Sequence, residues 1–139
     1  AELISNPARA FYGNLEIEYG DFYGGIRSTF GVEATASLTK NFGFSLGYRV
    51  NDIEFPLDEL QTNEIFTRFK YTFDVNMASF LLLQWNNELN ELNLNYKLNI
   101  KPSPGSDIYL VINKILSTHD GLISKDFVII LKVSWMFII

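Results

Sequence analysis

The chain of 139 residues contains no cysteine and a single histidine, His119. The lack of cysteine excludes a disulfide framework, a thiolate metal site and a cysteine nucleophile. One histidine excludes any site built from several. No run of about 18 apolar residues is present, so no transmembrane helix is predicted. No signal peptide is visible, because the chain starts Ala-Glu-Leu. If the protein is exported, we expect a mature chain or a fragment.

The composition nevertheless leans toward apolar and aromatic residues. Hydrophobic residues make up 47% of the chain and aromatics 15%, while the mean hydropathy is only +0.07. Apolar and polar positions must therefore alternate along the chain, and helical periodicity persists nowhere beyond a turn. The length predicts a single domain covering residues 1–139. The net charge of −5 argues against a nucleic-acid partner.

Turn signals separate segments that alternate between apolar and polar residues. In the segment 92–101, for example, five apolar residues alternate with Asn and Lys. Such alternation predicts half-buried strands. We count eight strands, at residues 10–19, 26–38, 42–50, 64–73, 77–85, 92–101, 107–113 and 127–139.

The last predicted strand is the most apolar. A soluble protein rarely ends on an uncovered apolar strand, because such an edge invites aggregation. In a closed barrel in lipid the same strand is paired on both sides and faces hydrocarbon. Outer-membrane barrels present a final strand of this kind to their assembly machinery, and here its signal residues are Trp135, Phe137 and Ile139.

Strands of about 9–11 residues in an even number suit a membrane barrel. With both termini on the periplasmic side, the periplasmic turns are shorter on average than the external connections, as such barrels require. The sequence therefore predicts an all-β fold, an antiparallel up-and-down transmembrane β-barrel of about eight strands. The periplasmic turns fall at 39–41, 74–76 and 102–106, and the external connections at 20–25, 51–63, 86–91 and 117–126.

Alternation alone does not say which face points outward, because a soluble lipid-binding barrel places its apolar groups inside. The charge-poor last strand and the small groups of the polar face favour an apolar face toward lipid. Aromatic residues also gather near the strand ends, as in interfacial girdles. The outer girdle contains Tyr19, Tyr23 and Trp85, and the inner girdle contains Phe42, Phe44, Tyr71, Phe73, Trp135 and Phe137.

With the apolar face outward, the charged residues of the strands line the lumen. Buried charges must be paired or hydrated, so we expect an interior ion-pair network. The external connections are mostly acidic, which predicts an acidic outer rim. The lumen set is Glu16, Glu18, Glu33 and Glu64 with Arg27, Arg49, Arg68, Lys70, Lys97, Lys101 and Lys132.

Few residues in the sequence suggest a catalytic or metal-binding site. Glu16 and Glu18 could act as an acid–base pair, but a structural salt-bridge ladder explains them better. The acidic segment 52–59 could hold calcium, but it lacks a defined ligand spacing. His119 has only Asp120 beside it, and no catalytic triad is present. We predict no catalytic residues, no cofactor, no metal site and no enzyme activity.

Several segments resemble one family. They are the proline–glycine turn and strand at 102–111, together with residues 6–9, 20–25, 48–52 and 68–73. The chain resembles the C-terminal barrel segment of large outer-membrane proteins of Bacteroidetes, which join a domain like the family 9 carbohydrate-binding modules to a barrel domain of unknown function. The carbohydrate-binding-like domain is absent here, and the family's barrel domain is several times longer.

The sequence thus favours a structural role in the bacterial outer membrane: an anchor or a subunit of an envelope assembly, with a possible link to glycans. The expected partners are outer-membrane lipid, the barrel-assembly machinery, and other envelope proteins or the rest of a larger barrel. A pore or transport component within a larger barrel is the first alternative. A soluble lipid-binding barrel is the second.

Overall fold

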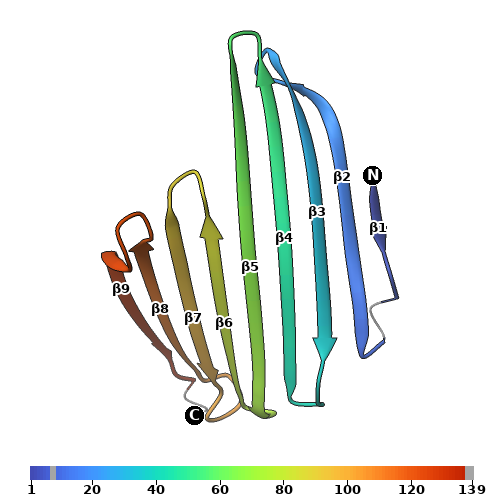
Figure 1. The fold of residues 1–139 in the computed structure, drawn as a ribbon. Helices are drawn as coiled ribbons and strands as arrows, with labels where there is room; N and C mark the ends of the chain where they lie inside the picture. The colour runs from blue at the N-terminus through green and yellow to red at the C-terminus, as the bar shows by residue number, and fades with distance from the viewer. Residues whose placement is uncertain (7–8, 137–139) are drawn as a thin grey trace.

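In the computed structural model, residues 1–6 and 9–136 are described, and they form one antiparallel sheet (Figure 1). Nine strands lie side by side in sequence order. Among the described residues no helix is long and apolar enough to cross a bilayer. The strands are β1 (Glu2–Ile4), β2 (Phe11–Phe22), β3 (Gly25–Ser37), β4 (Phe42–Phe55), β5 (Asp58–Asp74), β6 (Met77–Asn86), β7 (Glu91–Ile100), β8 (Asp107–Ser117) and β9 (Ile123–Ser134).

The all-β, up-and-down prediction is confirmed, but the sheet is open and its two edge strands, β1 and β9, do not pair with each other. The eight predicted strands correspond to β2–β9. Strand β1 is additional: it pairs with β2 through Leu3 opposite Leu15. Three residues are too few for alternation to be recognised in the sequence.

The predicted external loop at 51–63 is wrong. Strands β4 and β5 continue through it, Phe55 pairs with Asp58, and only residues 56–57 form the turn. The residues of this stretch are mainly polar and include Pro56, which is typical of a loop. Its side chains bond across the hairpin instead: Gln61 Nε2 donates to Asp52 Oδ1 at 3.1 Å.

The connection predicted at 20–25 is also shorter in the structure than in the prediction. Phe22 pairs with Gly25, so the turn is Tyr23 and Gly24 alone. Both have positive φ, 47° and 85°. Two consecutive positive φ angles define the type I′ turn, whose twist matches that of the flanking strands.

The last strand is also shifted. It begins at Ile123 rather than at 127 and ends at Ser134. Trp135 follows the strand, while Phe137 and Ile139 lie outside the described residues. A β-bulge between Ile115 and Leu116 on β8 changes the pairing with β9, which simple alternation cannot foresee.

The register separates two faces of the sheet. Because residues opposite each other in antiparallel strands share a face, Phe44, Phe69 and Leu81 lie on one side, which we call the apolar face. Their neighbours Ser45 and Arg68 lie on the other side, the polar face. On β2, β4, β6 and β7 the apolar set spans nine residues: 11–19, 42–50, 77–85 and 92–100.

Strands β2–β5 have 12 to 17 residues and β6–β9 have 10 to 12, and Figure 1 shows β2–β5 extending beyond the other four. In this extension the apolar face becomes polar and acidic. Asp52 and Glu54 lie on it, opposite Gln61 and Glu59. The apolar surface is therefore a band of limited height, above which the same face carries Asp52, Glu54 and Glu59, whereas Ile53 and Leu60 lie opposite each other on the polar face.

The sheet curves so that the polar face is hollowed. Thr29, Thr62 and Phe66 on that face are only 5%, 9% and 8% exposed, although the described residues form no second layer. Large side chains of the apolar face stay open, with Tyr19 at 77% and Leu131 at 65% exposure. The polar face is thus concave and the apolar face convex.

Gly47 gives a test of the packing on the concave face. Phe66 lies opposite it, and a Cβ at Gly47 would lie 2.0 Å from Phe66 Cζ. The Arg68 guanidinium sits 4.4 Å from the centroid of the same ring and restricts its movement. We expect Gly47→Ala to lower the free energy of unfolding by about 1–3 kcal/mol, measured by urea denaturation followed by circular dichroism.

Gly43→Ala is the matched control on the same strand and face. Its added Cβ would meet nothing closer than the Ala36 carbonyl oxygen at 3.9 Å, so we expect a change within about 0.5 kcal/mol. Equal stability of the two variants would contradict the packing of Phe66 on Gly47.

Candidate functional site on the polar face of the sheet

Two ion pairs of the polar face bridge strands that are not neighbours. Arg49 on β4 donates from Nη2 to Glu16 Oε2 on β2 at 2.7 Å, across β3. The residue between them in the register is Gly31. Strands two apart are separated by roughly 10 Å, so the two side chains meet because Gly31 has no side chain to keep them apart.

The second pair joins β5 to β3. Arg68 Nη1 donates to Glu33 Oε1 at 2.5 Å. Glu33 lies opposite Gly47, again a glycine on the intervening strand. The Phe66 ring fills the space above Gly47, and Arg68 stacks on that ring. A guanidinium that is both stacked and ion-paired is held more rigidly than a free arginine.

Two further pairs complete the ion pairs between strands in the described part of the chain. Arg27 lies 3.2 Å from Glu18, and Lys125 on β9 lies 3.0 Å from Glu91 on β7. The Lys125 pair was not predicted from the sequence, because both partners fall in predicted external connections, at 117–126 and 86–91. All four pairs keep a quarter or more of at least one partner exposed, so each contributes little to stability.

The other members of the predicted lumen network share the polar face by register. Glu64 lies opposite Arg49. Lys70 and Lys97 both lie opposite Phe80, and Lys132 lies opposite Tyr109. Among the described residues, no carboxylate forms an ion pair with any of these three lysines.

Aromatic residues of the predicted inner girdle gather on the apolar face near the short turns. The Phe42 and Tyr71 centroids are 6.4 Å apart, and Tyr71 and Phe73 meet edge to face at 4.7 Å. Phe44 contacts Phe69 at 5.2 Å. Phe69 was not assigned to a girdle, but it joins this cluster because the register places it opposite Phe44.

The predicted outer girdle is more scattered. Tyr19 lies on the apolar face, whereas Tyr23 occupies the hairpin turn and is 90% exposed. Trp85 lies on β6, and its indole Nε1 donates to Thr118 Oγ1 at 3.2 Å. Trp135 follows the end of β9.

The weak chemical candidates remain apart. The Nδ1 of His119 lies 3.1 Å from Asp120 Oδ1, and both side chains are exposed. No group of three or more potential metal ligands occurs within residues 1–6 and 9–136. Glu16 and Glu18 each have an arginine partner of their own, so their carboxylates are engaged in separate ion pairs.

Comparisons with protein-family models, curated proteins and solved structures gave no match. The resemblance to the Bacteroidetes outer-membrane family therefore stays a prediction. Since a fold alone does not define a function, the function has to be argued from the geometry of the two faces.

Gly31 is the residue with which the Glu16–Arg49 pair can be tested. A Cβ at Gly31 would lie 3.2 Å from Glu16 Oε2 and 3.8 Å from Arg49 Nε. We expect Gly31→Val to separate the pair and to lower the free energy of unfolding by about 1–3 kcal/mol. The coupling between Glu16 and Arg49, about 1 kcal/mol or less for so exposed a pair, should vanish in a double-mutant cycle built on Gly31→Val.

Gly20→Val serves as the control, because a Cβ at Gly20 has no atom within 4 Å. This variant should keep the coupling between Glu16 and Arg49. If the coupling persists in Gly31→Val, the glycine gap is not what lets the two side chains meet.

Proposed function

We propose that the chain is a wall of an outer-membrane β-barrel, with its apolar face against lipid and its polar face toward the lumen. The observation that carries this proposal is the direction of curvature: the sheet curls toward its polar face and leaves the apolar face convex and open. A soluble lipid-binding barrel needs the opposite curvature, because its ligand cavity is lined by apolar groups.

The dimensions of the apolar band support the same proposal. A tilted strand crosses the hydrocarbon core with about 9–11 residues, and the apolar sets of β2, β4, β6 and β7 each span nine. Above the band, the same face of the extension carries Asp52, Glu54 and Glu59. Strands of membrane barrels that continue into external hairpins have this profile.

The two edge strands of the sheet determine how it could close into a barrel. Strands β1 and β9 run in the same direction, since strands alternate in direction along the sheet. Closing all nine would require a parallel pair, whereas β9 and β2 are antiparallel and can close an even-numbered barrel. Strand β1 now occupies the β2 edge at residues 14–16, so closure through β2 requires β1 to leave.

The role we infer is structural rather than catalytic: an anchor or subunit of an assembly in the bacterial envelope. Its partners are then outer-membrane lipid along the band, the barrel-assembly machinery at the last strand, and other envelope proteins. The uncovered β9, all of whose residues from Ile123 to Ser134 are exposed, supports a further partner along that edge.

A second candidate is a pore component within a larger barrel. The observation that favours it is the open hollow of about 490 Å³ on the polar face, together with two unpaired edges. Eight strands leave a lumen filled by side chains. A solute path would therefore require this wall to be continued by more strands.

The orientation of the two faces can be tested with one pair of adjacent residues. Leu82 lies on the polar face opposite Arg68 and Asn95, and Leu83 lies on the apolar face opposite Leu94. The chain has no cysteine of its own, so Leu82→Cys and Leu83→Cys each offer one thiol for a bimane label. In vesicles of lipids with brominated acyl chains, we expect strong quenching of the label at 83 and little at 82.

The two variants are controls for each other, since they differ by one position on β6. Stronger quenching at 82 would reverse the proposed orientation. An absence of quenching at both positions in vesicle-bound protein would show that the sheet does not enter the hydrocarbon core.

Closure can be tested by spin labelling of the cysteine-free chain. Phe11 on β2 and Val133 on β9 are 70% and 59% exposed, so both accept a label. Closure through β2 and β9 predicts for Phe11→Cys/Val133→Cys a distance as short as that of a pair on neighbouring strands, whereas an open sheet keeps the two positions seven strand spacings apart, roughly 34 Å along the arc, and gives a longer straight-line distance. Dipolar electron paramagnetic resonance in detergent measures this distance.

Ile108→Cys/Val133→Cys is the reference pair, because these residues are opposite each other on neighbouring strands. It should give a short distance in either state. A long distance for the first pair and a short one for the reference would contradict closure by eight strands and would favour the larger wall.

A further inference from the structure

Charge is distributed unevenly along the polar face. Toward the long hairpins, arginines and glutamates form the pairs Arg27–Glu18 and Arg49–Glu16. Toward the short turns, beyond the Arg68–Glu33 pair, the described residues of this face include three lysines and one aspartate. These are Lys70, Lys97 and Lys132 with Asp107, while Lys101, a fourth lysine at this end, follows the last residue of β7.

Among the described residues, the lysines at this end have no acidic partner. Glu33 is engaged by Arg68 at 2.5 Å, and Asp107 accepts only a long hydrogen bond of 3.5 Å, from Asn99. Within the described residues, Lys70 and Lys97 form no ion pair. The chain as a whole has a net charge of −5. This end of the polar face is therefore opposite in charge to the protein as a whole.

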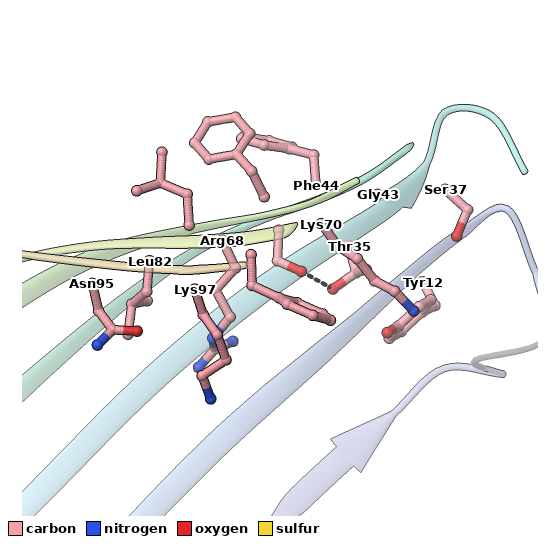
Figure 2. A pocket seen from close by; sticks show the side chains of 14 residues that line it. Tyr12, Thr35, Ser37, Gly43, Phe44, Arg68, Lys70, Leu82, Asn95 and Lys97 are labelled. Carbon is pink, nitrogen blue, oxygen red and sulfur yellow. Dashed lines mark hydrogen bonds between the residues drawn. The ribbon is translucent and has the colours of Figure 1, made fainter. Parts of the chain in front are cut away.

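Lys70 and Lys97 both belong to the hollow. Figure 2 shows Arg68, Lys70 and Lys97 projecting from the same side of the sheet, while Phe44 projects from the other side. Lys70 and Lys97 flank Phe80, which is opposite both. The hollow of about 490 Å³ also contains the hydroxyls of Thr35 and Ser45, 2.8 Å apart.

We propose that this hollow binds the phosphate group of a small soluble solute. Lys70 and Lys97 supply the two principal charges, and Arg68 contributes the part of its guanidinium that Glu33 does not occupy. Lysine ammonium groups bind phosphate as point charges, and hydroxyl groups such as those of Thr35 and Ser45 add neutral hydrogen bonds. A concave site focuses the field of these cations more strongly than a flat surface does.

A soluble solute fits the site better than a lipid headgroup, because the hollow lies on the concave face and the apolar band lies on the opposite, convex face. The inference depends only on the polar face. It does not depend on whether the convex face meets lipid, so the site and the membrane proposal can fail separately.

The test uses the whole chain, refolded in a maltoside detergent that carries no phosphate, with its β-structure checked by circular dichroism. Inorganic phosphate is titrated at constant ionic strength and binding is measured calorimetrically. We expect Lys70→Met and Lys97→Met each to weaken binding on the order of tenfold, the value of one lost charge-assisted hydrogen bond. Lys125→Met is the matched control, because Lys125 pairs with Glu91 outside the hollow.

A second variant should change phosphate affinity in the opposite direction. Glu33→Gln removes the acid that holds Arg68 and should tighten phosphate binding several-fold, since it frees a guanidinium at the edge of the hollow. Glu16→Gln makes the same change in net charge at the Arg49 pair and should leave binding near the wild-type value.

The proposal is overturned if the wild-type chain binds no phosphate, if Lys125→Met weakens binding as much as Lys70→Met does, or if Glu33→Gln fails to tighten it. Succinate provides the chemical comparison. Binding of this dicarboxylate as tight as that of phosphate would overturn the assignment to phosphate.

Discussion

The antiparallel register of β2–β5 is the constraint on which the other features depend. It places Glu16, Gly31, Arg49 and Glu64 in one row on one face, and Leu15, Val32 and Tyr48 on the other face. Side chains in a strand alternate with a period of two, so a slip of one residue would exchange the faces of a whole strand. The separation of a charged face from an apolar face therefore rests on this register.

The register also explains why glycine recurs on the polar face. Gly31 and Gly47 stand where a side chain from one neighbouring strand has to reach across to a third strand. Glu16 reaches Arg49 over the first, and Phe66 covers the second with Arg68 stacked above it. Contacts between strands two apart draw the sheet together on that side, which agrees with its concave polar face.

A single curved layer leaves large apolar side chains uncovered. Exposing a continuous apolar surface to water is unfavourable. The apolar face and β9 are uncovered, and the described residues form no second layer. All three features are explained if lipid or another protein covers the convex side. Lipid would cover a band of this height and would also account for the acidic residues that the same face carries above it. The polar face would then enclose charges that find partners at one end and remain unpaired cations at the other.

Much of the fold could be predicted from the sequence. The alternation in 92–101 and in 42–50 depends only on neighbouring residues, so it identified strands and their two faces before any tertiary contact was known. The extension through 51–63 could not be predicted, because the apolar alternation of β4 stops at Val50, and only the pairing of Asp52 with Gln61 shows that they are strand residues. Strand β1 and the bulge at Ile115 were missed for the same reason: they are defined by a partner strand and have no local pattern.

The candidate site, too, could be predicted only in part. Alternation along each strand already placed these bases and acids on one face, because residues two apart on a strand share a face. The pairs that they form could be seen only in the folded sheet. Arg68 pairs with Glu33, and Arg49 with Glu16, across an intervening strand, while Lys70 and Lys97 are left without acids of the described residues and face a hollow. The physical reason is that a charge pair depends on curvature and on the size of the residue between its partners, and both arise only when distant strands come together.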